Sequence, residues 1–270
     1  MSEISLPYVE QGDASGVPVL MLHGGTDSWR SFEPVLPHLP DDIRAVAVTR
    51  RGHGDAPKPE SGYRVEDLAG DVIALMEELD LGPAVLVGHS MGTMVAQRIA
   101  IEAPERVLGL VLGGAFGQPQ ANSPGLLELR AEFGEIQDPI ARERAHEFQE
   151  STTARPLDPD QLAVFVDETQ KVPARVWREI FSAFPEVDYA AELAALAPPA
   201  LIVQGGRDEM IPREERNALL GLLPGARLIV YEGAGHALHW EEPERFAADI
   251  AEFSRRASSR SRPRPHASAA

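Results

Sequence analysis

Cysteine is absent from all 270 residues of the sequence, which excludes a disulfide framework and a metal site built from thiolates. Long hydrophobic runs are absent as well, so no segment is expected to span a membrane. Residues 1–7 lack the basic and apolar regions of a signal peptide. Together these absences predict a cytoplasmic protein with no membrane partner.

Basic residues are scarce, with 25 Lys and Arg against 42 Asp and Glu and a formal net charge of −17. A field of this sign repels nucleic acid and anionic lipid, so neither is expected as a partner. The C-terminal end is the exception, because residues 254–270 carry five arginines and no acidic residue. We expect residues 257–270 to form a disordered basic tail.

Apolar residues make up 43% of the chain and fall in short runs that alternate with helical patterns. Near-continuous apolar strands with helical crossovers predict an α/β fold, with a mostly parallel central sheet flanked by helices. The expected strands are residues 8–11 at an edge, 17–22, 43–48, 84–87, 107–112, 200–205 and 227–231. The expected helices are residues 32–39, 65–79, 91–102, 213–222 and 243–256.

The alternation stops between residues 117 and 198, where helical periodicity continues without a convincing core strand. Helices are expected there within residues 126–133, 139–149, 159–170, 174–184 and 189–196. A segment of that length exceeds an ordinary loop. We therefore expect residues 117–198 to form an all-helical cap, inserted between the two parts of the α/β core at residues 1–116 and 199–256.

Residues 88–92 read GHSMG and stand between an apolar strand and a helix. The pattern G-x-S-x-G in that context is typical of the nucleophile elbow, a tight turn without room for side chains at Gly88 and Gly92. Such a turn presents the serine hydroxyl outside the sheet, beside the first amides of the helix. Ser90 is therefore the expected catalytic nucleophile.

A serine needs a base to accept its proton and an acid to orient that base. His236 follows the last expected strand in a glycine-rich loop, at the same sheet edge as Ser90, and is the expected base. His239, three residues further on, is the alternative. Asp208 follows the preceding strand and is the expected acid, with Glu209 as the alternative.

Attack on a carbonyl places negative charge on its oxygen, which two preset backbone amides can hold. Met91, directly after the serine, is expected to supply one amide of this oxyanion hole. Gly25, in the loop after an early strand, is expected to supply the other. Its neighbours Gly24 and Thr26 are expected to contact the substrate.

Five motifs together resemble those of the α/β-hydrolase superfamily, in its cap-bearing branch of small esterases, lactonases, cofactor-free haloperoxidase-like enzymes and carbon–carbon bond hydrolases. The matching residues are 23–25 (HGG), 51–54 (RGHG), 88–92 (GHSMG), 206–208 (GRD) and 235–236 (GH). The order serine, acid, histidine along the chain is also that of this superfamily. The resemblance implies catalysis by a Ser-His-Asp triad, with no metal and no cofactor.

Two departures from the family pattern carry information. Many relatives have an aspartate two residues before Arg51, where this chain has Thr49 followed by Arg50. That segment is expected to be structural, and His53 within it to stabilise its loop. Epoxide hydrolases and haloalkane dehalogenases resemble this fold but use aspartate as the nucleophile, so Ser90 argues against both.

The expected function is hydrolysis of a carboxylic ester or lactone of a mostly apolar small molecule through an acyl-enzyme. Substrate choice is expected to rest with the cap, where Trp177 and Phe181 are candidate pocket residues. A carbon–carbon bond hydrolase of a ring-fission diketone, or an acyltransferase or perhydrolase, would use the same triad. A slow-turnover ligand receptor is an alternative of another class. A monomer or a homodimer is expected.

Overall fold

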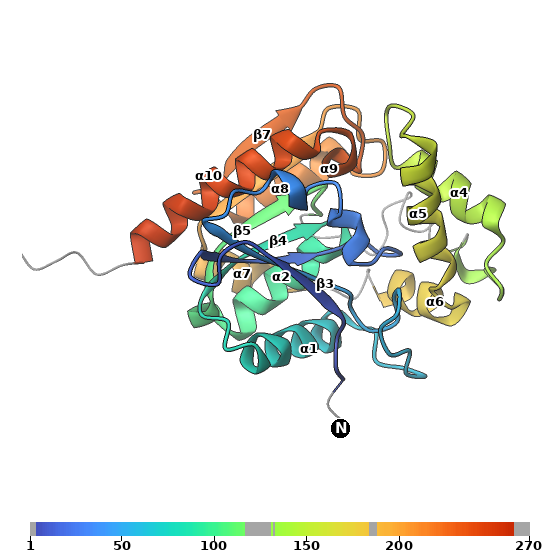
Figure 1. Ribbon diagram of the computed structural model, residues 1–270, viewed down its shortest axis with the longest axis horizontal. Helices are drawn as coiled ribbons and strands as arrows, with labels where there is room; N and C mark the ends of the chain where they lie inside the picture. The colour runs from blue at the N-terminus through green and yellow to red at the C-terminus, as the bar shows by residue number, and fades with distance from the viewer. Residues whose placement is uncertain (1–3, 117–130, 132, 184–187, 262–270) are drawn as a thin grey trace, which may run out of the picture.

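The computed structural model describes residues 4–116, 131, 133–183 and 188–261, and Figure 1 shows a central sheet between layers of helices. Within these residues the sheet has seven strands, and the expected α/β fold is confirmed. The strands are β1 (Tyr8–Gln11), β2 (Val17–Leu22), β3 (Ile43–Val48), β4 (Ala84–His89), β5 (Val107–Gly113), β6 (Ala200–Gly205) and β7 (Arg227–Tyr231).

The strands are ordered β1–β3–β2–β4–β5–β6–β7 across the sheet. Strand β1 is antiparallel to β3, whereas every other neighbouring pair is parallel. Parallel strands end at the same edge of a sheet, so the loops that follow β2, β4, β6 and β7 meet there. Those four loops, with the first residue of the helix after β4, carry every residue of the expected triad and oxyanion hole.

Apolar side chains alternate between the two faces of the sheet, as β2 illustrates. Leu20 and Leu22 belong to the apolar cluster under α1 (Val65–Glu78) and α2 (Met91–Glu102), while Val19 and Met21 belong to the cluster under α10 (Pro243–Ser261). Because both faces are covered, the strands read as near-continuous apolar runs. The helices of the core include α1 (Val65–Glu78), α2 (Met91–Glu102), α8 (Arg213–Leu222), α9 (Leu238–Glu241) and α10 (Pro243–Ser261).

Residues 32–39 do not form the single helix that we expected. The structure has two short 3₁₀ helices instead, η1 (Trp29–Phe32) and η2 (Leu36–His38), and a third, η3 (Pro104–Arg106), precedes β5. Pro34 and Pro37 explain the interruption, because proline has no amide hydrogen to donate and its ring clashes with the preceding helical turn.

The last helix, α10, is longer than expected and continues to Ser261. The prediction of a disordered tail from residue 257 is therefore wrong for residues 257–261. Ala257 explains the extension, because it is 5% exposed and packs in the apolar cluster beneath the helix. The rest of the expected tail, residues 262–270, lies outside the described residues.

Three of the helices that the structure describes between β5 and β6 stand apart from the sheet, on the right in Figure 1: α4 (Arg142–Ser151), α5 (Pro159–Gln170) and α6 (Ala174–Ala183). We call them the cap helices. A further described helix, α7 (Ala190–Leu196), packs on the core against α2 and α8, so placing it in the cap was wrong. Helical periodicity shows that Leu193 faces apolar neighbours but not which ones. Most of the helix expected at 126–133 lies outside the described residues.

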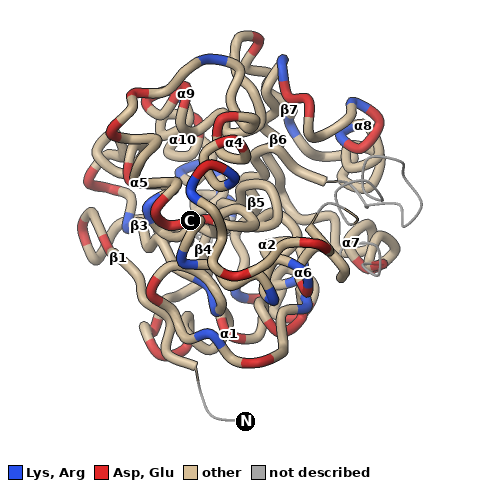
Figure 2. Tube along the Cα trace, turned by 90° about the vertical axis from the view of Figure 1, so that its right-hand side faces the viewer, with Lys and Arg blue, Asp and Glu red and all other residues tan. Residues whose placement is uncertain are grey.

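Charged side chains of both signs are interspersed over the molecule. Figure 2 shows acidic positions on most of the elements facing the viewer, with shorter basic segments between them. Surface ion pairs such as Arg44 with Glu10 and Arg98 with Glu102, both at 2.7 Å, join neighbouring elements or turns.

Among the described residues, no helix combines the length and the apolar character needed to cross a bilayer.

Candidate active site

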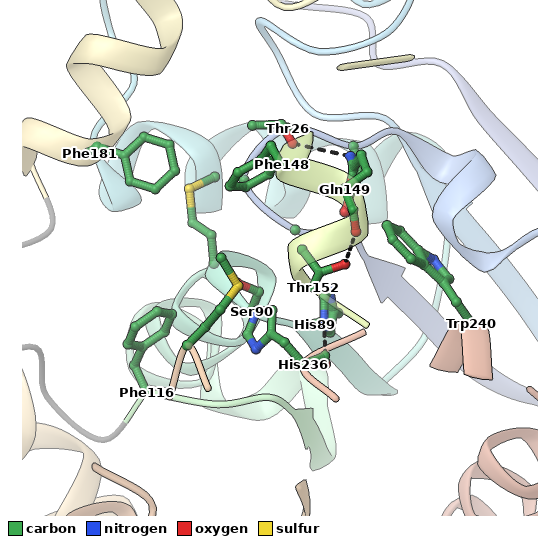
Figure 3. Close-up of a pocket in the computed structure, with 15 residues that line it drawn as sticks. Thr26, His89, Ser90, Phe116, Phe148, Gln149, Thr152, Phe181, His236 and Trp240 are labelled. Atoms are coloured by element: carbon green, nitrogen blue, oxygen red, sulfur yellow. Dashed lines mark hydrogen bonds between the residues drawn. The ribbon is translucent and has the colours of Figure 1, made fainter. Parts of the chain in front are cut away.

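A pocket lies where the loops at the carboxyl edge of the sheet meet the cap helices (Figure 3). Its wall is mostly apolar, and in Figure 3 Phe116 and Phe181 lie on one side of Ser90 while Trp240 lies on the other. The described residues that line it are Gly24, Gly25, Thr26, Asp27, His89, Ser90, Met91, Phe116, Phe148, Gln149, Thr152, Phe181, Met210, His236 and Trp240.

Ser90 stands at the turn between β4 and α2, where the backbone is strained. Its φ of 50° and ψ of −122° lie outside the regions that residues with a side chain normally adopt. A Cβ at Gly88 would lie 2.5 Å from the carbonyl oxygen of Gly92, and one at Gly92 would lie 2.1 Å from that of Leu22. Only glycine fits at these two positions, and the turn places Ser90 at the pocket.

His236 lies in the loop after β7 and is oriented by Asp208, in the loop after β6. The His236 ring donates from Nδ1 to Asp208 Oδ2 over 3.0 Å, and both side chains are at most 5% exposed. This bond leaves Nε2 as the ring nitrogen available to Ser90, which lines the same pocket. The structure therefore brings the three expected residues to one site.

The carboxylate of Asp208 is held in its charged form by its surroundings. Its Oδ2 also accepts from Gln204 Nε2 at 2.6 Å, and its Oδ1 accepts from the amides of Met210 and Ile211 at 2.9 and 3.0 Å. Burial alone would raise the pKa of Asp208, but the neighbouring His236 and the hydrogen bonds outweigh burial and hold the pKa below its ordinary value. An ionised Asp208 stabilises a positive charge on the imidazole ring.

The two alternatives for these roles lie elsewhere. His239 is fully buried, its Nε2 is hydrogen-bonded to Ser31 Oγ at 2.9 Å, and burial holds its pKa well below the ordinary value. Glu209 is described by the structure and is not among the residues that line the pocket. The geometry therefore favours Asp208 and His236.

The residues expected to form the oxyanion hole, Gly25 and Met91, line the same pocket as Ser90. The loop after β2 brings Gly24, Gly25 and Thr26 to the pocket wall. Met91 is the first residue of α2, so its amide has no partner within the helix and lies at the positive end of the helix dipole. A Cβ at Gly24 would lie 3.6 Å from Ser90 Cβ, which shows how closely the loop approaches the serine.

A polar bridge links the cap helices to this loop, and the sequence analysis missed it. Gln149 of α4 donates from Nε2 to Asp27 Oδ1 at 3.0 Å and to Thr169 Oγ1 of α5 at 2.6 Å. Burial raises the pKa of Asp27, opposed by the Gln149 hydrogen bond and the nearby Arg50 charge. Asp27 follows the HGG motif and could have been proposed from that position. Gln149 stands in no motif.

One of the two aromatic residues expected at the pocket is not part of its lining. Phe181 lines the pocket, whereas Trp177 is 1% exposed and packs behind it. The Trp177 ring lies 5.2 Å from that of Phe148 and 5.0 Å from that of Phe133, measured between centroids. The structure therefore does not place Trp177 at the pocket wall, where we expected it. Both residues lie on α6, and periodicity alone did not separate the pocket side from the core side.

With this geometry in place, comparison with known proteins identifies the family. A family model described as the α/β-hydrolase fold matches residues 17–243. The chain belongs to the α/β-hydrolase family. It is 30% identical to a non-heme chloroperoxidase from Streptomyces lividans, over 91% of this chain and 94% of that protein. It is 28% identical to a 2-hydroxymuconate semialdehyde hydrolase from Pseudomonas sp. (strain CF600), covering 88% and 87% of the two chains.

Solved structures of this α/β-hydrolase fold superpose closely on the chain. A thermophilic esterase from Thermogutta terrifontis has a TM-score of 0.83 and 26% identity, over 94% of each chain. An esterase, RhEst1, from Rhodococcus sp. ECU1013 has a TM-score of 0.82 and 25% identity, over 93% of this chain and 95% of that one. The relatives thus include hydrolases of more than one bond type.

Proposed function

We propose that this α/β hydrolase is a serine esterase, which cleaves a carboxylic ester or lactone of a mostly apolar small molecule. The observation that carries the proposal is the position of Ser90, on a strained turn at the floor of an apolar pocket shared with an Asp208-oriented His236. Esterases among the structures of the same fold support ester chemistry.

The reaction proceeds by two acyl transfers. Ser90 Oγ attacks the carbonyl carbon while His236 takes its proton, and the amides of Met91 and Gly25 stabilise the charge on the carbonyl oxygen. His236 then protonates the leaving alcohol, which departs and leaves an acyl-enzyme. Water, deprotonated by His236, attacks the acyl carbon and releases the acid. Asp208 keeps the ring oriented and stabilises its positive charge throughout.

The pocket chemistry favours a neutral substrate. The wall is mostly apolar and includes three phenylalanines, a tryptophan and two methionines, and the described lining residues include no Lys or Arg. Asp27 would repel a substrate carboxylate when ionised. These features favour a neutral ester or lactone over the carboxylate-bearing substrates that many carbon–carbon bond hydrolases accept.

The test is hydrolysis of p-nitrophenyl esters of increasing acyl length, with γ-lactones and a ring-fission dienoate as further substrates. Wild-type protein is expected to turn over aryl esters many times. Ser90→Ala is expected to lower kcat on the order of 10⁴- to 10⁶-fold. Ester turnover that survives in Ser90→Ala would contradict the proposal, and tight binding without multiple turnover would favour a receptor.

A second candidate is perhydrolysis, which the chloroperoxidase relative favours. In that reaction hydrogen peroxide replaces water in the second step, so that the acyl-enzyme is released as a peracid. Adding peroxide to the ester assay distinguishes the two reactions. Peracid formed faster than acid at equal nucleophile concentration would favour the perhydrolase, and an unchanged acid yield would favour the esterase. An added alcohol that diverts the acyl group would reveal an acyltransferase in the same assay.

A further inference from the structure

Arg50 is a buried cation behind the loop that carries Gly24 and Gly25. It is 1% exposed, and its Nη2 donates to the carbonyl oxygens of His23 and Gly24 at 2.7 and 2.6 Å. Arg50 does not line the pocket, although the structure describes it fully. Its side chain therefore contacts the loop, through these carbonyl oxygens and His23 Nδ1 at 3.1 Å, and not the pocket.

This position is unfavourable for the stability of the fold. The Nε and Nη1 atoms of Arg50 are buried and have no hydrogen-bond partner among the described residues. Burial lowers the pKa of Arg50 to about 9, opposed by the charge of Asp27, so the guanidinium stays charged at neutral pH. A buried charge with unpaired donors costs free energy of folding. A purely structural role explains such a residue poorly.

His23 contacts the same carbonyl group from the same loop. Its Nε2 accepts from the Arg50 backbone amide at 3.1 Å, which assigns the ring proton to Nδ1. That Nδ1–H donates to the carbonyl oxygen of Gly24 at 2.8 Å. Two donors, one of them charged, therefore hold the oxygen of the Gly24–Gly25 peptide.

We propose that Arg50 is the positioning residue of the oxyanion hole, which aims the Gly25 N–H at the oxygen of the reacting carbonyl. The inference rests on the proposed esterase function. The Gly24–Gly25 peptide is trans, and in a trans peptide the C=O and N–H bonds point in opposite directions. Holding the Gly24 oxygen towards Arg50 therefore turns the Gly25 N–H away from it, and a cation on the oxygen side polarises the peptide so that its N–H donates more strongly.

The first test compares R50M and R50Q with R51Q. Arg51 is the matched control, because it is the neighbouring arginine, is 14% exposed and pairs with Asp71 and the Gly62 carbonyl, away from this loop. R50M is expected to lower kcat on the order of 100-fold with KM nearly unchanged, since the interaction strengthens only in the transition state. R50Q restores one N–H donor without the charge and is expected to recover about 10-fold of that loss. R51Q is expected to lower Tm and leave kcat per active site unchanged.

The second test measures binding of an oxyanion mimic. An aryl trifluoromethyl ketone forms a bond from Ser90 Oγ to its carbonyl carbon, the carbonyl electron pair moves to oxygen, and the serine proton passes to His236. R50M is expected to weaken binding of this ketone on the order of 100-fold, and R50Q about 10-fold. Binding of the matching alcohol, which forms no such bond, is expected to change by less than about 10-fold in either variant. This second readout applies to R50Q alone if R50M fails to fold.

Three outcomes separate the two proposals. If wild type hydrolyses aryl esters, S90A does not, and R50M or R50Q lose kcat and ketone affinity, both proposals stand. If S90A is inactive but the Arg50 variants match R51Q in both readouts, the positioning role is overturned and the esterase stands. If S90A retains the wild-type rate, the esterase mechanism itself is overturned.

Discussion

Backbone contacts hold the pocket-lining residues of the α/β core in place, whereas packing between side chains positions those of the cap helices. The loops of Asp208 and His236 are joined by backbone hydrogen bonds, from Gly206 to Tyr231 at 2.8 Å and from Arg207 to Ala234 at 2.9 Å. In the cap, by contrast, the aromatic side chains stack on one another. The centroids of Phe133 and Phe181 lie 4.2 Å apart, and those of Phe133 and Phe148 lie 5.7 Å apart.

We infer from this difference that the core determines the rate of the reaction and the cap determines which substrate is preferred. A catalytic group displaced by about 1 Å loses much of its effect, so strained turns and bonded loops suit the core. A pocket wall made of packed aromatic side chains can change shape by substitution without disturbing Ser90. We therefore expect core substitutions to change kcat most, and cap substitutions to change the preferred substrate.

The largest expected effect comes from the core, in Asp208→Asn. The change preserves the size of the side chain but removes the charge that holds the His236 ring and its proton. We expect kcat to fall on the order of 10⁴-fold, as in other triads that lose this carboxylate. The measurement is kcat for a p-nitrophenyl ester, with Glu209→Gln as control. An equal loss in both variants would contradict the assignment of the acid.

We expect acid to destabilise the protein mainly through the core, because the core contains buried histidines. Burial lowers the pKa values of His53 and His89 to about 3, whereas the side chain of His146 in the cap is 48% exposed. The pKa of histidine in the unfolded chain is about 6.5, so both states hold these rings neutral above that pH. The contribution of the buried neutral rings to the free energy of unfolding is therefore fully present above pH 6.5. It is lost as pH falls towards 3, by about 1.4 kcal/mol per pH unit for each ring.

The measurement is Tm, followed by tryptophan fluorescence, from pH 7.5 to 4.5. Tm is expected to decline steadily below pH 6.5, and His146→Gln is expected to keep the same slope. A Tm that stays constant down to pH 4.5 would contradict this explanation of acid sensitivity.

Gln149→Leu breaks the polar bridge between core and cap. Asp27 loses the donor to its Oδ1, and Thr169 loses a partner as well, so we expect stability to fall by about 1–3 kcal/mol. Urea unfolding measures the loss. The control is Gln170→Leu, which removes a hydrogen bond to Ile140 within the cap and away from Asp27. The bridge is unimportant if the two variants have the same stability and the same kcat.

The smallest expected effect concerns the apolar wall. Phe181→Ala opens space beside Gly25 and should raise kcat/KM for long acyl esters relative to acetate by about 10-fold, or roughly 1.4 kcal/mol. Trp177→Phe is the control, because Trp177 packs behind the wall. This substitution should lower Tm without changing the preferred acyl length. If Trp177→Phe changes the preferred acyl length and Phe181→Ala does not, Phe181 is not the residue that sets this preference.

The sequence predicted the core and the positions of its candidate catalytic residues well, because backbone geometry demands particular residues there. The turn around Ser90 has room only for glycine at positions 88 and 92, so the five residues GHSMG were enough to predict where the turn lies. The edge that unites Ser90, Asp208 and His236 followed from the order of strands and helices. Strand β1 was also placed correctly at an edge of the sheet, although its antiparallel direction was not predicted.

The cap was less predictable because its contacts depend on packing between segments far apart in sequence. Periodicity placed Trp177 and Phe181 on one helix, but did not show that one lines the pocket and the other lies behind it. It did not show that α7 packs on the core, or that Gln149 reaches across to Asp27. Arg50 was noticed only as part of a departure from the family pattern, because its partners are backbone carbonyls that no motif names.

We propose that Asp208 and His236 make Ser90 nucleophilic, and labelling with diethyl p-nitrophenyl phosphate tests this. Phosphorylation of the serine releases one equivalent of p-nitrophenol, and peptide mass spectrometry locates the phosphoryl group. We predict one equivalent per chain, on Ser90, with labelling much slower in Asp208→Asn and unchanged in Phe181→Ala. A label on another residue, or the same labelling rate in Ser90→Ala, would contradict the claim.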